Sequence, residues 1–201
     1  MTRTLITGAG GGVGSVSRTV VELLLDSGEP VRAMVRRDDE RAQQLRAVGA
    51  DVVIGDLTRA ADIVDAMVGV HRMFFNMSVS ADYLLTTAEV SAVAVERGHL
   101  DAIVNMSQMT LTSTGESEHQ RLHGLAEHVI NWSGLPAIHV RPTVFLENPL
   151  FSMLGARTVK DRGVLALPFG TGRTSPIAAA DVAAVVAAVL RDPAEHLGAV
   201  Y

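Results

Sequence analysis

The stretch of sequence that decides the fold lies at the start of the chain and reads Thr4-Leu5-Ile6-Thr7-Gly8-Ala9-Gly10-Gly11-Gly12-Val13-Gly14. It begins as a short apolar strand, and a helical pattern of apolar residues follows its last glycine. Glycines at such a turn let the backbone bend sharply and approach a pyrophosphate, which the N-terminus of the following helix stabilises. The residues that this pattern assigns to dinucleotide binding are Gly8, Gly10, Gly11, Gly12, Val13 and Gly14. A turn that is glycine-rich for steric reasons alone is the alternative, and the strand–loop–helix context favours binding over it.

Short apolar runs alternate with helical patterns over the first two thirds of the chain. The predicted strands are 4–7, 31–35, 51–54, 72–75, 102–105 and 137–140. Glycines that suit helix ends precede five of these runs, namely Gly28, Gly49, Gly69, Gly98 and Gly134. Ser117 and Gln120 match a capping box, which predicts a helix from there to Trp132. The order of elements predicts an α/β fold with a doubly wound parallel sheet, the Rossmann fold, covered by helices on both faces.

The alternation ends after Pro142, where loops, a Gly- and Pro-rich stretch and an Ala-rich helix over 179–190 are predicted. We expect an NAD(P)-binding core over residues 1–142 and a small C-terminal substrate lobe over residues 143–201, packed on the core as one compact unit. Ligands collect at the carboxyl ends of the strands in such sheets, and the lobe would lie there. Apolar residues of the lobe would line a pocket for a flat substrate or serve ordinary core packing, and they are Phe145, Leu146, Phe151, Met153 and Leu154.

The composition of the 201 residues, 48% hydrophobic and 19% charged, is that of a globular protein with a sizeable core. A formal net charge of −5 argues against a nucleic-acid partner. The absence of cysteine excludes a disulfide scaffold, thiolate zinc sites and cysteine nucleophiles. Because the N-terminal apolar run is too short for a signal peptide and no later apolar segment could span a bilayer, we expect a soluble cytoplasmic protein without a membrane partner.

Two arginines, Arg36 and Arg37, stand at the end of the second predicted strand. An acidic residue at this position binds the ribose 2′-hydroxyl of NAD(H), whereas an arginine accommodates the 2′-phosphate of NADP(H). Two guanidinium groups can hold a phosphate through forked hydrogen bonds. The sequence therefore favours NADP(H), and NAD(H) is the alternative if the arginines instead pair with Asp38, Asp39 and Glu40.

Further motifs extend over essentially the whole chain. They are the Gly8/Gly11/Gly14 spacing, the run 31–36, Gly55-Asp56-Leu57, His123 with Glu127 four residues on, Ser133-Gly134-Leu135-Pro136 leading to Arg141-Pro142, and the stretch 175–183. Together they resemble the NmrA-like group of atypical short-chain dehydrogenases/reductases, which includes NAD(P)H:quinone oxidoreductases and redox-sensing regulators. The cofactor contacts that the resemblance implies are Asp56 with Leu57 near the adenine, Asn76 with Met77 under the middle of the cofactor, and Pro142 beside the nicotinamide. For Asp56, a position beside Thr58 at the start of the next helix is the alternative.

Most short-chain dehydrogenases use a Tyr-x-x-x-Lys pair, in which the lysine lowers the tyrosine pKa so that the phenol can pass a proton. This chain has two tyrosines, Tyr83 and Tyr201, and a single lysine, Lys160, so it contains no such pair. Tyrosine catalysis of the standard kind is therefore excluded.

The helix that would carry that pair instead carries His119 and His123, while Ser107 ends the fifth strand roughly where the catalytic serine would stand. His123 and His119 are candidate proton donors, because the histidine pKa lies close to physiological pH. The alternative is that His123 and Glu127 only cover a helix surface or fix its packing. No third ligand accompanies the two histidines, so no metal is expected.

The leading interpretation is an NADP(H)-binding atypical short-chain reductase that transfers hydride to a quinone or small carbonyl compound without a Tyr-x-x-x-Lys pair. A quinone takes hydride readily and can collect its proton from water. The alternative is a non-catalytic NAD(P) redox sensor that regulates a protein partner, which the missing pair favours. A homodimer is among the assemblies that the resemblance allows.

Overall fold

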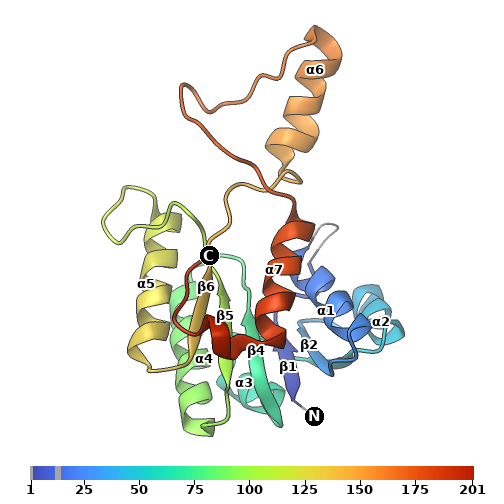
Figure 1. The fold of residues 1–201 in the computed structure, drawn as a ribbon, viewed down its shortest axis with the longest axis vertical. Coiled ribbons are helices and arrows are strands. Elements are labelled where there is room, and N and C mark those ends of the chain that lie inside the picture. The colour runs from blue at the N-terminus through green and yellow to red at the C-terminus, as the bar shows by residue number, and fades with distance from the viewer. Residues whose placement is uncertain (1, 12–14) are drawn as a thin grey trace.

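A six-stranded parallel sheet forms the centre of the computed structural model, which describes residues 2–11 and 15–201 (Figure 1). The strands are β1 (Arg3–Ile6), β2 (Val31–Val35), β3 (Asp51–Ile54), β4 (Val70–Phe75), β5 (Ala102–Met106) and β6 (Ala137–Val140). Their order across the sheet is β3-β2-β1-β4-β5-β6, and every neighbouring pair is parallel. The chain starts in the middle of the sheet, winds to one edge and then crosses to build the other half. This arrangement confirms the predicted doubly wound α/β fold.

Helices cover both faces of this sheet because their apolar positions recur every three or four residues. They are α1 (Val16–Asp26), α2 (Glu40–Ala47), α3 (Ala60–Ala66), α4 (Tyr83–Arg97), α5 (Glu118–Trp132), the π-helix η1 (Leu150–Gly155), α6 (Ala156–Arg162), α7 (Ala179–Arg191) and the 3-10 helix η2 (Pro193–His196). One hydrophobic cluster joins the sheet to α1, α2 and α7, and a second joins it to α3, α4 and α5. The two clusters bury five of the strands in a middle layer, whereas the edge strand β3 is only partly buried.

The ends of the helices match the sequence pattern in one respect and differ in another. Gly98 ends α4 with a φ of 62°, as predicted for a left-handed residue after a helix. Ser117 precedes α5 as predicted, but its side chain makes no capping hydrogen bond, so the expected capping box is wrong. The turn before α5 is held instead by Arg121, whose guanidinium donates to the carbonyls of Gly115 and Glu116.

The C-terminal part of the chain divides between two places, which differs from the single lobe expected over residues 143–201. Residues 143–178 carry η1 and α6 and project from the carboxyl ends of the strands, whereas α7 returns to lie beside α1 (Figure 1). Val182, Val186 and Leu190 of α7 are buried in the same cluster as α1, which gives this helix its place in the core. The last residues continue the sheet, because Val200 forms a parallel bridge with His139 of β6.

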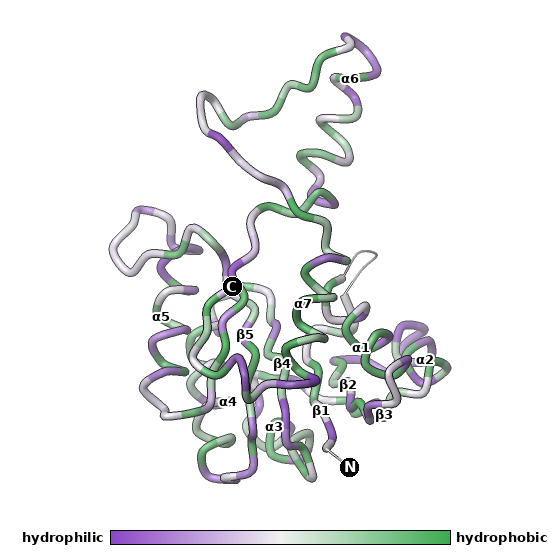
Figure 2. Tube along the Cα trace, in the orientation of Figure 1, coloured by the Kyte–Doolittle hydropathy of each residue, from purple (hydrophilic) through white to green (hydrophobic). Residues whose placement is uncertain are grey.

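The hydropathy of the chain follows the same division. Figure 2 shows hydrophobic residues along α7, and the buried ones among them pack in the same cluster as α1 and the sheet. The projecting segment exposes several apolar side chains, among them Met153, Val164 and Leu165. In the part of the chain that the structure describes, no helix is long and apolar enough to cross a membrane.

Candidate active site

Two cavities lie side by side along the carboxyl ends of the strands. The first, about 520 Å³, is lined by the glycine loop, the end of β2 and the segment after β3, and we call it the glycine-loop cavity. The second, about 580 Å³, is lined by residues after β4, β5 and β6 together with two histidines of α5, and we call it the histidine cavity. Asn76, Met77 and Ser78 line both cavities, so the two adjoin at this segment after β4.

The glycine-loop cavity is built on a close contact between β1 and β4. Gly8 has a φ of 74°, and a Cβ placed on it would lie 2.8 Å from the carbonyl oxygen of Asn76, so only glycine fits. Thr7 and Asn76 exchange two hydrogen bonds of 2.9 Å, and the Asn76 side chain donates to Ser17 of α1 at 2.8 Å. The loop, the end of β4 and the start of α1 are thus fixed to one another. Gly8, Gly10 and Gly11 line the cavity as predicted residues of the site, whereas Gly12, Val13 and Gly14 lie outside the described residues.

Arginines line the outer end of this cavity. Arg36 and Arg37 both contribute to its wall, and neither pairs with the acidic residues that follow them in the described structure. Asp38 pairs instead with Arg46 at 2.6 Å, and Asp39 pairs with Arg41 at 2.6 Å. The structure therefore does not show the alternative in which Arg36 and Arg37 pair with Asp38, Asp39 and Glu40, although Arg36 lies 3.5 Å from Asp56.

Arg41 is a third arginine of this wall, and the sequence reasoning missed it. Its guanidinium bonds to Asp39 and donates to the carbonyl oxygen of Gly10 at 2.9 Å, so it joins α2 to the glycine loop. The Arg41 guanidinium holds the pKa of the Asp39 carboxyl below its usual range, and the same carboxylate accepts from the backbone at the start of α2. A position in the first turn of the helix after β2 was the signal that could have identified it.

Asp56 and Leu57 follow β3 at the same end. Leu57 lines the glycine-loop cavity, but Asp56 does not. Asp56 accepts hydrogen bonds from the backbone and hydroxyl of Thr58, which lower its pKa, and its other oxygen lies 3.5 Å from Nε of Arg36. The structure thus puts Asp56 in the turn before α3, as the alternative reading has it, while also placing it against a predicted phosphate-binding arginine.

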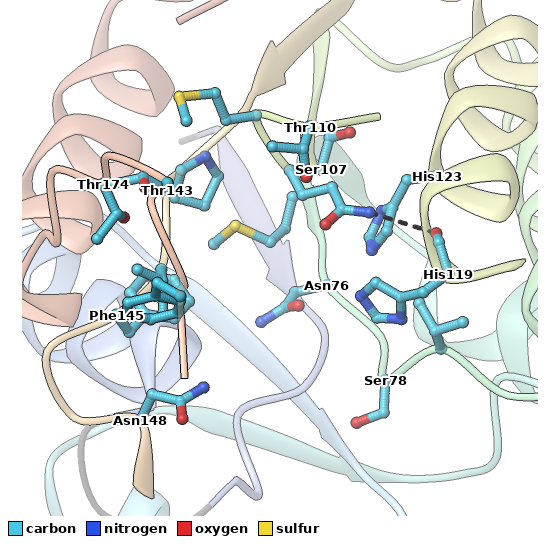
Figure 3. Close-up of a pocket in the computed structure, with 18 of the residues that line it drawn as sticks. Asn76, Ser78, Ser107, Thr110, His119, His123, Thr143, Phe145, Asn148 and Thr174 are labelled. Atoms are coloured by element: carbon cyan, nitrogen blue, oxygen red, sulfur yellow. Dashed lines mark hydrogen bonds between the residues drawn. The ribbon is translucent and has the colours of Figure 1, made fainter. Parts of the chain in front are cut away.

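The histidine cavity has a wall of histidines and, opposite it, a wall of mixed polar and apolar residues. His119 and His123 lie on one side and Phe145, Asn148 and Thr174 on the other, with Asn76 between them (Figure 3). Pro142 lines this cavity too, whereas Met153 and Leu154, which were expected in a pocket, are exposed on the projecting segment, and Leu146 is exposed as well. Phe151 packs on Phe169, a cavity residue, with ring centroids 5.8 Å apart.

Ser107 lies directly after β5 at the base of the histidine cavity. Its side chain is buried, and its hydroxyl meets the geometry of a hydrogen bond with no described residue. It lies close enough to Glu127 to contribute to lowering the pKa of that carboxyl. A buried hydroxyl without a defined partner at the base of a cavity is a group that a ligand can satisfy.

His123 is held by a residue that the sequence reasoning did not assign to the site. The hydroxyl of Tyr83, the first residue of α4, lies 3.2 Å from Nδ1 of His123, and the His119 and His123 rings meet edge to face with centroids 4.9 Å apart. Burial, together with the neighbouring His119, lowers the pKa of His123 to about 4, although Glu127 opposes the change. Burial also raises the pKa of Tyr83. At neutral pH the Tyr83 and His123 rings are therefore both uncharged.

Glu127, one turn beyond His123, forms a buried ion pair rather than a surface contact. Its carboxylate is 4% exposed and receives two hydrogen bonds from the Arg141 guanidinium, at 3.0 and 2.5 Å. Burial opposes the ionisation of Glu127, but Arg141 holds its pKa below the usual range. The idea that His123 and Glu127 merely cover a helix surface is wrong, because both side chains are buried.

Acid is expected to destabilise the fold partly through His123. The groups that face its ring are Tyr83, His119 and Glu127. The folded-state pKa of about 4 lies below 6.5, the ordinary value for a histidine, so the unfolded chain binds more protons. Stability therefore falls as the pH drops from about 6.5 toward about 4. Between pH 7 and pH 5 the loss from this one group is roughly 2 kcal/mol.

Urea unfolding of the wild type and of His123→Gln at the two pH values measures this contribution. Between pH 7 and pH 5, His123→Gln should lose roughly 2 kcal/mol less stability than the wild type. The control His128→Gln, at an exposed position of the same helix, should lose as much stability as the wild type. Equal acid sensitivity of His123→Gln and the wild type would contradict the assignment.

Comparisons with known proteins agree with this geometry. Residues 11–193 match the NAD(P)H-binding family. An NAD(P)H azoreductase from Xenophilus azovorans is 28% identical over 183 residues, 91% of this chain and 62% of that protein. A (4-alkanoyl-5-oxo-2,5-dihydrofuran-3-yl)methyl phosphate reductase from Streptomyces griseus is 31% identical over 187 residues, 92% of this chain and 62% of that protein. The crystal structure of an NADPH-dependent quinone oxidoreductase from Escherichia coli, complexed with NADPH, superposes on the whole chain and on 68% of its own, with a TM-score of 0.82 and 25% identity.

The chain spans about 62% of the length of the curated relatives that it matches. The matches confirm the resemblance to NmrA-like atypical short-chain reductases, and the family match extends from the glycine loop through α7. This chain belongs to the NAD(P)H-binding family.

Proposed function

We propose that this chain is an NADP(H)-dependent reductase that transfers hydride to a quinone or to another small acceptor of similar shape. The observation that carries the proposal is that the two cavities share Asn76, Met77 and Ser78 in their walls and so adjoin at the end of β4. A dinucleotide whose pyrophosphate lies at the glycine loop would extend along this shared floor toward the histidines. Relatives named as an azoreductase and a quinone oxidoreductase fit an acceptor of this kind.

The glycine-loop cavity fits the cofactor because its backbone is cleared for a close approach. Gly8 leaves the space that a Cβ would fill, and the N-terminus of α1 follows the loop. Arg36 and Arg37 would bind the 2′-phosphate, with Asp56 orienting Arg36. NADPH, when bound, supplies the hydride.

The remaining predicted contacts are assigned by their place in the cleft. Leu57 would pack on the adenine, Asn76 and Met77 would lie under the middle of the cofactor, and Pro142 would lie beside the nicotinamide. NAD(H) remains the alternative cofactor, for which the two arginines would have no phosphate to bind.

The histidine cavity would hold the acceptor. Reduction of a quinone to a hydroquinone takes one hydride and one proton, and the proton comes from water or from a cavity residue. Ser107 offers a buried hydroxyl that meets hydrogen-bond geometry with none of the described residues, while His119 and His123 form one wall of the cavity. Residues 143–178 would act as the substrate lobe, with Phe145 and Phe169 covering a flat ring.

Titration of NADPH with the protein, followed by a panel of quinones, tests the proposal. We expect enhanced NADPH fluorescence on binding and its decay when a quinone is added. A signal that changes on binding and then persists through the panel would favour the alternative, a redox sensor. A signal that never changes would contradict dinucleotide binding itself.

Two glycine variants make this test specific. In Gly8→Ala the new Cβ would lie 2.8 Å from the Asn76 oxygen, whereas in Gly28→Ala, at a φ of 79°, it would meet nothing within 4 Å. Both variants place alanine at a positive φ and share that strain. Only Gly8→Ala should abolish the fluorescence change, because Gly28 lines neither cavity.

A further inference from the structure

Tyr83 reaches the histidine cavity only through another side chain. It is 1% exposed, its ring stacks with Phe75, and it lines neither cavity. Its hydroxyl contacts Nδ1 of His123 across 40 residues of sequence. Any effect of Tyr83 on a bound molecule must therefore pass through the His123 ring, which does line the cavity.

The direction of this hydrogen bond follows from what the buried hydroxyl can reach. Among the described residues, Nδ1 of His123 is the one hydrogen-bond partner of the Tyr83 hydroxyl. If Nδ1 carried the ring proton, the phenol would accept that bond and its own proton would be buried without an acceptor. A buried donor without a partner is unfavourable enough to disfavour this tautomer roughly tenfold or more. The Tyr83 hydroxyl therefore donates to Nδ1.

The proton of the His123 ring must then lie on its other nitrogen, Nε2. Burial raises the pKa of Tyr83, so the phenol keeps its proton, and burial lowers the pKa of His123 to about 4, so the ring carries one proton at neutral pH. Nε2 makes no hydrogen bond to a described residue and is not among the buried side-chain atoms without a partner. It is thus open to the cavity.

We propose that Tyr83 fixes His123 as the Nε2–H tautomer, so that the ring presents a neutral hydrogen-bond donor to an acceptor atom of the substrate. This inference rests on the proposed function and narrows its substrate class. The molecule reduced carries a carbonyl oxygen or an azo nitrogen next to the carbon or nitrogen that receives hydride. A neutral donor aimed at that atom stabilises the negative charge that develops there. His123 keeps its proton during this step, and the acceptor atom takes its proton from water.

The tautomer can be read directly by 15N NMR of the imidazole nitrogens at pH 7, without substrate or cofactor. The chain has seven histidines, and the signals of His123 are those that disappear in His123→Gln. We expect a protonated Nε2 and an unprotonated Nδ1 in the wild type. In Tyr83→Phe the share of the Nδ1–H form should rise at least about tenfold, because no hydroxyl then disfavours it.

Tyr201→Phe is the matched control, because it removes a second tyrosine hydroxyl that contacts a histidine, His196, outside both cavities. This variant should leave the His123 signals unchanged. A wild-type His123 protonated at Nδ1, or Tyr83→Phe signals identical to those of the wild type, would overturn the proposal. The wild-type spectrum decides the first point even if the variant fails to fold.

Kinetics separate this inference from the function on which it rests. Tyr83→Phe should lower kcat for a quinone about five- to tenfold while the KM for NADPH stays unchanged, because Tyr83 acts as a positioning residue on the acceptor side alone. A merely structural role would lower thermal stability and move both constants together, which would overturn the inference. A protein with the predicted tautomer that reduces no acceptor would contradict the proposed function instead.

Discussion

Replacing Arg36 and Arg37 together with alanine is expected to weaken NADPH binding about a hundredfold while changing NADH binding by less than about threefold. The two guanidinium groups line the outer end of the glycine-loop cavity, where the 2′-phosphate would lie. A charge-assisted hydrogen bond is worth about 1.5–3 kcal/mol, so the loss of two such bonds at the lower end of that range gives a change of this size. NADH lacks the 2′-phosphate, so its affinity should change little when the two arginines are removed.

The other arginines of this region determine how large the difference between the losses of NADPH and NADH affinity will be. Arg41 also lines the cavity, but Asp39 and the Gly10 carbonyl already occupy its guanidinium, so it cannot replace the missing pair without breaking both contacts. Arg46→Ala is the matched control, because Arg46 pairs with Asp38 outside the cavity and should leave both affinities unchanged. The measurement is a fluorescence titration of each variant with each cofactor, and equal losses for NADPH and NADH would contradict the assignment.

The sequence predicted the parts of the molecule that depend on local spacing. All six strands lie within two residues of their predicted bounds, because buried parallel strands read as short apolar runs between helical patterns. The glycine loop and Arg36 with Arg37 lie together in one cavity, since the carboxyl ends of neighbouring parallel strands meet at one edge of the sheet. These features required no knowledge of which side chains meet across the fold.

The parts that could not be predicted are pairs of residues from different elements. Tyr83 and His123 are 40 residues apart, and no periodicity in α4 or α5 states that the first residue of one meets the middle of the other. The partner of Glu127 could not be predicted either. Helical spacing suggests a contact with His123, four residues earlier, whereas in the structure Glu127 binds Arg141, which follows β6. The place of α7 beside α1 rather than in a separate lobe also depends on tertiary packing.

Replacing Arg141 with methionine is expected to destabilise the fold by about 2–4 kcal/mol at pH 7, because it leaves the carboxylate of Glu127 buried and without its ion-pair partner. The side chain of Arg141 is itself 33% exposed, so water reaches part of the pair and the loss lies toward the lower end of that range. Glu127 lies one turn from His123, and Pro142 follows Arg141, so both walls of the histidine cavity depend on this contact.

The charge of Glu127, rather than the lost packing of Arg141, is the predicted cause, and a second substitution separates the two. Glu127→Gln in the Arg141→Met background removes the unpaired charge and should recover more than half of the lost stability in urea unfolding. Arg157→Met, which breaks an exposed ion pair with Asp161 on α6, should change stability by no more than about 0.5 kcal/mol.

The stability loss caused by Arg141→Met should depend on pH, because it arises from the charge of Glu127. Arg141 lowers the folded-state pKa of Glu127, so in the wild type the pair contributes stability above the unfolded pKa and loses it as the pH falls through the folded value. Without Arg141, burial, the largest influence on this carboxyl, is opposed only by Ser107 and His139 among the described residues, so the pKa of Glu127 should rise. The variant should therefore regain stability relative to the wild type as the pH is lowered toward 4.5, the ordinary value for a glutamate. A deficit that stays constant from pH 7 to that value, or that Glu127→Gln fails to reduce, would assign the loss to packing and not to the buried charge.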